Sequence, residues 1–334
     1  MARHRFDLIG VGNPIMDVLA HVDDAFLQQH VAGDKGGMVL VDDADIAHLT
    51  RLIGTQLAMQ PGGAAANTTL GATKLGLKTT FLGKIGGDIT AEHYFENFTA
   101  AGGDGSRFKR AILPNGRCLS MVTPDGQRTM RTHLGAAMTL SPDEITVADF
   151  AGCRHAHVEG YLMFNPALAE KVMQTARVAG CTLSLDLASF EVVSVARDWI
   201  FEQLRAGVDV VFANEDEART LFQRDDEFDN YARELASFGG IAAVKMGKDG
   251  AWVAQGDDMQ RVFPVSVERV VDTTGAGDSW AAGFLFGYLR GRTLGVAGAI
   301  GSMMGAETVQ HLGASIPDIH WPRLRAHAEE FGQA

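Results

Sequence analysis

The sequence predicts an α/β fold built on a doubly wound, mostly parallel sheet with a small β-rich lid. From about residue 155 onward, short apolar stretches of strand character alternate with helical stretches, which indicates βαβ units with helices on both faces of the sheet. Before that point, residues 118–133 alternate polar and apolar side chains on either side of a turn, as in an antiparallel hairpin. With 334 residues, we expect a single domain over residues 1–334, whose lid comes from about residues 15–50 and 110–137.

The first half of the chain contains the residues that predict the lid and the first strands of the sheet. Phe6–Gly12 is apolar and ends in glycine, as a buried strand followed by a tight turn would. The hairpin has its turn at Pro124–Gly126, a turn-forming triplet. The other elements expected here are strands at 38–41 and 79–83 and helices at 64–75 and 90–101.

The second half of the chain contains the alternating strands and helices that predict the parallel sheet. Candidate strands lie at 155–159, 182–186, 208–213, 241–246 and 251–254. Candidate helices lie at 167–178, 198–204, 215–221 and 231–238, followed by two glycine- and alanine-rich helices at 279–290 and 294–308. Small side chains on the last two helices would allow their backbones to approach closely.

Composition excludes several functions. Acidic residues outnumber basic ones by 41 to 29, giving a net charge of −12, and such a surface repels nucleic-acid phosphates and anionic lipid. The N-terminus has no apolar signal-peptide core, and no run of about 18 apolar residues could span a membrane. Three widely spaced cysteines favour a reducing, cytoplasmic location without disulfides.

One cluster suggests a metal at first sight. Cys153, His155 and His157 would share one face of a strand. Because no fourth ligand lies nearby in the sequence, we expect these side chains to be packing residues.

The strongest chemical signal is a glycine turn ahead of an apolar helix. Gly275, Ala276 and Gly277 would let several backbone N–H groups converge at the positive end of the helix dipole, forming an anion hole. Asp278 lies at its mouth, where a carboxylate would repel an anion unless it accepts a proton. This combination fits phosphoryl transfer to a hydroxyl, with Asp278 as general base. The alternative is an ordinary helix start with an acid in its first turn.

Two further segments offer groups for a hydroxylated substrate. Gly62 and Gly63 allow close approach to the backbone, and Asn67 offers a donor and an acceptor to neighbouring hydroxyls. Asp17 follows the first strand, where it could bind a vicinal diol or simply form a turn.

These segments together resemble a known family. Residues 62–86 and 272–285 are similar, along their whole length and in their order and separation, to the paired signatures of the ribokinase/PfkB carbohydrate kinases. The resemblance covers nearly the whole chain. It implies a ribokinase-like sheet with a β lid, and ATP-dependent phosphorylation of a hydroxymethyl group.

The resemblance also implies roles for individual residues. Asp278 matches the general base and Gly275–Gly277 the anion hole, while Asp17, Gly63 and Asn67 match positions that bind substrate hydroxyls, with Gly62 beside them. The remaining matches are Asn214, Lys245, Gly247 and Gly277 near the nucleotide, Glu217 near Mg²⁺ through water, and Asp272 and Thr274 near a K⁺ ion in some members. Read without the resemblance, Glu217 is an exposed acid at a helix start and Lys245 belongs to a hairpin.

Finer features resemble the adenosine-kinase-like branch. These are the hairpin ending at 128–137 and the run Glu159–Leu162, together with the absence of the Asp-Pro-Asn-x-Arg segment of many sugar kinases. They imply a cytoplasmic, magnesium-dependent enzyme of purine salvage that phosphorylates the 5′-hydroxyl of adenosine. Candidate apolar side chains for the walls of a purine pocket are Met38, Met130, Tyr161 and Phe164, although packing in the core or lid is the more ordinary role for each. The charge over the transferred phosphoryl could come from Arg128 or Arg131, and the alternative is a solvated charge on the hairpin.

Two alternatives stay open. One is a kinase for a free sugar such as ribose or fructose, and the other is a relative that binds its ligand without catalysis. Either way, the partner is a small molecule rather than nucleic acid or membrane, and a homodimer formed through the lid also stays open.

Overall fold

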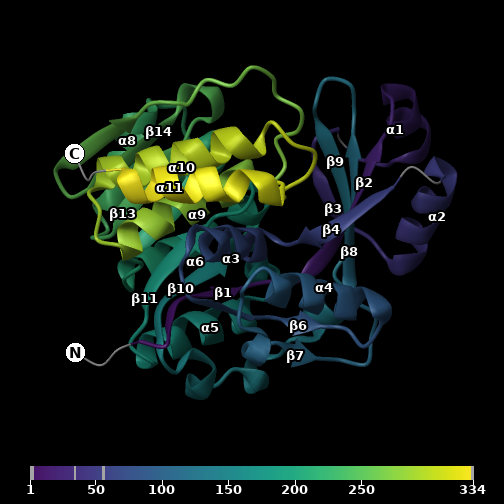
Figure 1. Ribbon diagram of the computed structural model, residues 1–334, viewed down its shortest axis with the longest axis horizontal. Coiled ribbons are helices and arrows are strands. Elements are labelled where there is room, and N and C mark those ends of the chain that lie inside the picture. The colour runs from purple at the N-terminus through teal and green to yellow at the C-terminus, as the bar shows by residue number, and fades with distance from the viewer. Residues whose placement is uncertain (1–3, 34, 55–56, 332–334) are drawn as a thin grey trace.

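The computed structural model describes residues 4–33, 35–54 and 57–331. It contains an eight-stranded main sheet and a five-stranded second sheet (Figure 1). The main sheet has the order β15-β14-β13-β12-β11-β10-β1-β5. Its strands are β1 (Phe6–Val11), β5 (Thr79–Leu82), β10 (Cys153–Glu159), β11 (Thr182–Asp186), β12 (Val210–Asn214), β13 (Ile241–Lys245), β14 (Ala251–Gln255) and β15 (Asp258–Val262).

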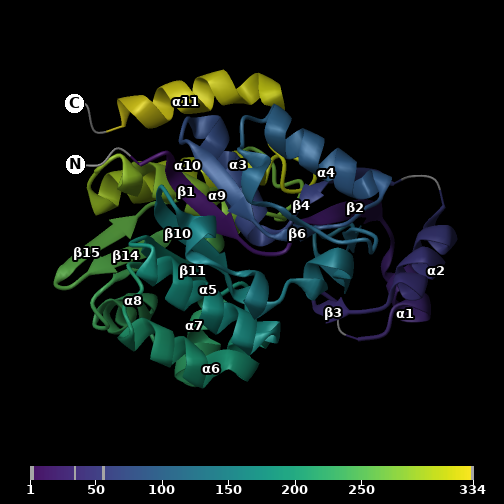
Figure 2. The same ribbon diagram turned by 90° about the horizontal axis from the view of Figure 1, so that it is seen from below.

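All pairs from β5 to β13 are parallel, and the β13–β14 and β14–β15 pairs at one edge are antiparallel. The parallel strands are buried almost throughout because helices cover both faces. One face carries α3 (Ala64–Leu75), α9 (Ala276–Leu289), α10 (Leu294–Thr308) and α11 (Trp321–Glu330). The other carries α5 (Pro166–Val178), α6 (Phe190–Arg205), α7 (Glu215–Phe222) and α8 (Phe228–Ala236), and Figure 2 shows the two layers. The doubly wound fold is therefore confirmed.

The second sheet has the order β3-β9-β8-β2-β4 and lies beside the main sheet in Figure 1. Its strands are β2 (Ile15–His21), β3 (Met38–Leu40), β4 (Ala58–Gly62), β8 (Gly116–Val122) and β9 (Arg128–His133), and α1 (Asp24–His30) and α2 (Asp43–Ile53) pack on its outer face. The hairpin is present, with Gly126 at φ +79° in its turn. We call this sheet with α1 and α2 the lid; β4 belongs to it, although the expected lid segment ended near residue 50.

The remaining helix and strands flank the junction of the two sheets. They are α4 (Ile89–Ala100), β6 (Lys84–Ile85) and β7 (Lys109–Arg110). Short 3₁₀ turns elsewhere in the chain include η5 (Gly160–Phe164) and η7 (Asp318–His320). A correction concerns α6: it begins at Phe190 rather than at residue 198, because the Ser189 hydroxyl caps the Val192 N–H. In the described part of the chain, no helix is long and apolar enough to cross a membrane.

The cluster on β10 packs as expected. His155 hydrogen-bonds Thr182 Oγ1 at 2.7 Å and Ser184 Oγ at 2.8 Å, and His157 Nδ1 bonds the same Ser184 hydroxyl at 2.8 Å. Cys153 is a buried free thiol. The hydrogen bonds of the two histidines join β10 to β11 inside the protein.

Candidate active site

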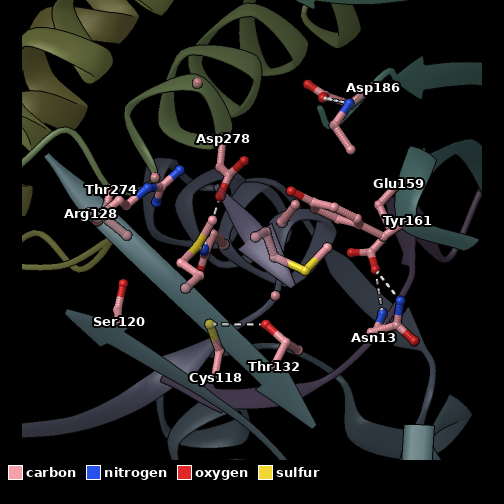
Figure 3. A pocket seen from close by; sticks show the side chains of 18 of the residues that line it. Asn13, Cys118, Ser120, Arg128, Thr132, Glu159, Tyr161, Asp186, Thr274 and Asp278 are labelled. Carbon is pink, nitrogen blue, oxygen red and sulfur yellow. Dashed lines mark hydrogen bonds between the residues drawn. The ribbon is translucent and has the colours of Figure 1, made fainter. Parts of the chain in front are cut away.

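A cavity of about 340 Å³ lies between the carboxyl ends of the main-sheet strands and the inner face of the lid (Figure 3). In parallel α/β sheets this edge is where ligands bind. From the main-sheet side the lining includes Asn13, Glu159, Tyr161, Asp186, Asn214, Glu217, Lys245, Thr274, Gly275, Gly277 and Asp278. From the lid it includes Asp17, Met38, Leu40, Cys118, Ser120, Arg128, Met130 and Thr132.

The first turn of α9 forms one wall. Gly275 is its N-cap with φ +69°, a left-handed conformation that favours glycine, and a Cβ there would lie 2.4 Å from Ala314 Cβ. Amides in the first turn of a helix have no acceptor within the helix, so this turn can serve an anion. The Ala276 amide makes one long hydrogen bond, 3.3 Å, to the Thr273 carbonyl.

Asp278 follows in the same turn and faces α3. Its Oδ2 accepts a 2.9 Å hydrogen bond from Asn67 Nδ2, and its carbonyl accepts one from Thr68 Oγ1 at 3.1 Å. Burial raises the pKa of Asp278 to about 6; the Asn67 hydrogen bond opposes this rise and the nearby Asp186 charge adds to it. A carboxylate with this pKa is ionised at neutral pH and basic enough to accept a proton.

Asp17 reaches the cavity from strand β2 of the lid. Among the described residues, none donates a hydrogen bond to its carboxylate, so both oxygens can accept from a ligand. Burial raises its pKa to about 7, and the Arg128 charge opposes this rise. A Cβ on Gly62 would lie 2.3 Å from Asp17 Oδ2, and one on Gly63, at φ +98°, would lie 2.2 Å from the Asn13 carbonyl. Because neither glycine has a side chain, the Asp17 carboxylate fits beside Gly62 and the Asn13 carbonyl fits beside Gly63 at the edge of the cavity.

Of the two arginines predicted to reach the phosphoryl group, Arg128 and Arg131, the structure brings only Arg128 to the cavity. Arg128 lines it and lowers the pKa of both Asp17 and Asp278 through its charge. Arg131 is buried in the lid, where its guanidinium donates to the carbonyls of Ala32 and Met130.

Three carboxyl groups, those of Asp186, Glu217 and Asp278, surround Lys245 at the main-sheet side of the cavity. Lys245 Nζ lies 3.1 Å from Asp186 Oδ2, and Gly277 approaches the same amine, since a Cβ there would be 3.2 Å from it. Glu217 and Asn214 form a reciprocal helix cap in which Glu217 accepts from the Asn214 amide and side chain. Burial, and then the Asp186 charge, raises the pKa of Glu217 to about 8.

Asp272 lies beneath the cavity, fully buried. Its Oδ1 accepts from the Thr274 amide and hydroxyl, and its Oδ2 accepts from the Gly313 amide at 2.8 Å. The Val309 carbonyl accepts from the Val271 and Asp272 amides. Asp272 thus ties the segment ahead of α9 to the segment that follows α10.

Most predicted site residues meet at this cavity. Those that line it are Asp17, Gly63, Asn67, Arg128, Asn214, Glu217, Lys245, Gly247, Thr274, Gly275, Gly277 and Asp278. Gly62, Ala276 and Asp272 lie next to lining residues instead. All four predicted apolar side chains also line it, and the rings of Tyr161 and Phe164 stack with centroids 6.3 Å apart.

Sequence reasoning missed Glu159 and Asp186 as site residues. Glu159, which is 1% exposed, accepts hydrogen bonds from the Asn13 amide and side chain at 2.8 and 2.6 Å and from the Ala65 amide at 3.0 Å. Both acids occupy the last position of a predicted parallel strand. That position was the available signal, because the carboxyl ends of such strands meet at one edge.

Comparisons with known proteins agree with this geometry. Residues 39–321 match the model of the pfkB family carbohydrate kinases. An adenosine kinase structure from Sinorhizobium meliloti is 32% identical, covers 97% of this chain and 99% of its own, and superposes with a TM-score of 0.89. A probable sugar kinase from Rhizobium etli is also 32% identical, covers 98% and 99%, and has a TM-score of 0.90.

Curated relatives include both kinds of enzyme. The adenosine kinase of Saccharomyces cerevisiae is 26% identical over 93% of this chain and 96% of its own length. The 2-dehydro-3-deoxygluconokinase of Bacillus subtilis is 29% identical over 74% and 80%. With its ribokinase-like sheet and a family match over most of its length, this chain belongs to the pfkB family of carbohydrate kinases, enzymes that transfer phosphate to a hydroxyl group.

Proposed function

We propose that this kinase transfers the γ-phosphoryl group of ATP to the 5′-hydroxyl of a nucleoside, with adenosine as the substrate. The observation that carries the proposal is the position of Asp278 in the first turn of α9: it lines the same cavity as Asp17, whose carboxylate accepts no hydrogen bond from the residues that the structure describes. The likeness to adenosine kinases over nearly the whole chain supports the choice of nucleoside.

Asp278 acts as general base in this proposal. Asn67 holds its Oδ2, and Asp278 removes the proton of the 5′-hydroxyl as that oxygen attacks the γ-phosphorus. The bond from the γ-phosphorus to the bridging oxygen breaks, and ADP leaves. The amides of Gly275–Gly277 stabilise the charge on the transferred group, which is usually a larger contribution than proton removal.

The nucleotide and its metal fit the lysine side of the cavity. Asp186, Glu217 and Asp278 surround the amine of Lys245 with three carboxyl groups, whose oxygens are the ligands that Mg²⁺ prefers. Glu217 would hold Mg²⁺ through water, since Mg²⁺ usually keeps several waters. When bound, Mg²⁺ neutralises charge on the phosphates. Asn214, Lys245 and Gly247 would lie along the nucleotide. A K⁺ ion beside Asp272 and Thr274 remains a prediction.

The substrate side suits a flat base and its ribose. Asp17 and Asn67 offer partners for the ribose hydroxyls, and the apolar side chains of Met38, Met130, Tyr161 and Phe164 offer flat walls. Closure of the lid over this side would exclude water and protect ATP from hydrolysis. A cytoplasmic location also stays our expectation, in line with three free buried cysteines.

A sugar kinase is the second candidate. The lid face also presents Cys118, Ser120 and Thr132, small polar side chains that could contact a compact sugar. The 32% identical probable sugar kinase favours it as well.

A coupled assay of ADP release separates the candidates. The panel is adenosine, inosine, guanosine, cytidine, ribose and fructose, each with MgATP. We expect the highest kcat/KM with adenosine. A higher kcat/KM with ribose or fructose would overturn the nucleoside assignment in favour of the sugar kinase, and tight adenosine binding without ADP release would overturn catalysis.

A further inference from the structure

Three metal-ligating side chains meet outside the cavity, where α10 ends. Glu307 lies in the last turn of α10, His311 follows four residues later, and His320 is the last residue of η7. Their ligand atoms all lie within 4.8 Å of one another, the only such group of three among the residues that the structure describes. None of the three lines the cavity of the active site.

Both imidazoles face the same carboxylate oxygen. His320 Nδ1 lies 2.9 Å and His311 Nε2 lies 3.4 Å from Glu307 Oε1. Four-coordinate Zn²⁺ binds His nitrogen and carboxylate oxygen at about 2.0–2.2 Å, which separates neighbouring ligand atoms by about 3.4 Å. The two distances to Glu307 therefore need to change by about half an ångström or less. The ligand nitrogens of the two histidines lie within 4.8 Å of one another, so they would also need to reach a separation of about 3.4 Å.

The surroundings of the carboxylate fit a metal ligand. Glu307 Oε2 accepts a 2.7 Å hydrogen bond from Arg323 Nη2, so the carboxylate is oriented and its Oε1 faces the histidines. Such outer contacts commonly fix the ligands of protein metal sites. The Glu307 side chain is 8% exposed, whereas the His320 side chain is 33% exposed. An ion could enter past His320, and water could supply a fourth ligand.

We propose that Glu307, His311 and His320 form a binding site for a transition-metal ion of the Zn²⁺ class. Two imidazoles and one carboxylate, with a position left for water, are a ligand set that Zn²⁺ accepts and that Mg²⁺, which prefers oxygen ligands, does not. The site is separate from the magnesium position at Glu217 and does not depend on which substrate the enzyme phosphorylates.

The ion would brace the floor of the active site. Glu307 and His320 lie on either side of residues 309–317, which connect α10 to η7 and include His311. In this segment the Val309 carbonyl and the Gly313 amide hold Asp272, and Ala314 packs against Gly275. Metal binding therefore joins the end of α10 to the start of α11 across the segment that supports the first turn of α9.

The test uses the full chain without a histidine tag, stripped of metal and free of nucleotide. Co²⁺ titration followed by visible absorption reports nitrogen and oxygen ligation, and Zn²⁺ competition against a chromophoric chelator gives affinity. The variant is His311→Ala/His320→Ala. The matched control is His327→Ala, which removes an exposed histidine of α11 that lies outside the cluster. His320→Gln alone is a second variant, a single polar substitution that leaves His311 in place.

We expect one equivalent of Zn²⁺ per chain in the parent and in His327→Ala, with a higher midpoint of thermal unfolding when Zn²⁺ is present. Loss of an outer contact costs about 10–100-fold in metal affinity, so loss of two ligands should cost more than about 100-fold. His320→Gln should also weaken binding and reduce the thermal shift. Absence of saturable Zn²⁺ binding, or equal affinity in the parent and in both cluster variants, would overturn the site.

Discussion

At the residue scale, the chemistry rests on a carboxyl group whose environment makes it a useful base. Asp278 is buried and accepts from Asn67, so its orientation is fixed before the substrate arrives. Asp278→Asn keeps the size of the side chain and an oxygen that can accept from Asn67, but it cannot take a proton. Since general-base catalysis contributes about 10²–10⁴-fold, kcat should fall by at least about 100-fold.

Binding provides the control for this variant. Calorimetric titration of Asp278→Asn with the nucleoside should give a Kd within a few-fold of the parent value, because the substrate's other contacts remain. A kcat within about tenfold of the parent would show that another group removes the proton.

The same carboxyl group predicts a pH dependence. The ionised form of Asp278 is the active one, and its pKa is raised to about 6, so kcat/KM should fall as pH drops through that value. Asp17, with a pKa raised to about 7, faces the same cavity, and the acid limb will report both carboxyl groups together. Steady-state rates from pH 5 to about 8.5 measure this limb.

Arg128 offers an independent test of which groups produce the acid limb of the pH profile. Its charge lowers the pKa of Asp17 and Asp278, so Arg128→Ala should move the acid limb to higher pH. Arg117→Ala is the matched control, because Arg117 is in the neighbouring lid strand and pairs with Asp43 away from the cavity. An acid limb that stays in place in Arg128→Ala would assign it to other groups.

The sequence alone could predict those site residues that belong to a short local motif. The glycine turn before Asp278 and the Asn214–Glu217 spacing both describe the first turn of a helix, so four or five residues suffice. Glu159 is different: its partners Asn13 and Ala65 are 146 and 94 residues away in the chain. Only the pairing of β10 with β1 brings them together, and no local pattern encodes that pairing.

At the scale of elements, the difference between local patterns and long-range pairing explains why a strand such as β4 was not predicted. The parallel strands are short stretches with strand character that alternate with helices, and they were predicted within a few residues. Strand β4 contains the Gln60–Gly62 motif and reads as a loop, yet it pairs with β2 across Ile15–Gly62 to Leu19–Ala58. Tertiary pairing, not local propensity, makes this segment a strand.

The packing of α9 on α10 yields a stability prediction. The two helices approach through glycines, and a Cβ built on Gly283 would lie 2.7 Å from the Ile300 carbonyl oxygen. Gly283→Ala therefore overpacks the contact and should lower the free energy of unfolding by about 1–3 kcal/mol. Urea unfolding followed by fluorescence of the tryptophans measures the change.

Gly295 supplies the matched control on α10. A Cβ there would meet only the Gln260 side chain, at an ordinary 3.5 Å. Gly295→Ala should be neutral or stabilise the protein by up to about 1 kcal/mol through helix propensity. If Gly283→Ala proved as stable as Gly295→Ala, close backbone approach would not be what these glycines provide.

At the scale of the whole molecule, the main sheet and the lid are joined close to Glu159. The chain leaves the main sheet between β1 and β2 through Asn13, and it returns between β4 and α3 ahead of Ala65. The Glu159 carboxylate accepts hydrogen bonds from both crossings, and Gly12 leaves room for it, since a Cβ there would lie 2.2 Å from Glu159 Oε2. One buried side chain thus holds two of the connections between the main sheet and the lid, together with the start of α3, which carries Asn67.

Glu159 is therefore a positioning residue, and Glu159→Gln tests it. The amide has one acceptor oxygen for three N–H donors, and its own NH₂ must face at least one of them. An unpaired buried donor costs about 1–3 kcal/mol. We expect faster hydrogen exchange in peptides covering residues 12–17 and 62–67, and a rise in KM for the nucleoside larger than the fall in kcat, because the substrate side is displaced while Asp278 stays on α9.

Glu144→Gln is the control for Glu159→Gln, since Glu144 pairs with Lys84 outside the cavity. It should leave the exchange of both peptides and the KM unchanged. A merely structural role for Glu159 would lower stability and leave KM unaffected in the folded fraction. Unchanged exchange at both crossings in Glu159→Gln would show that the lid is attached through other contacts, and that the burial of this carboxyl group, whose pKa is raised to about 7, serves another purpose.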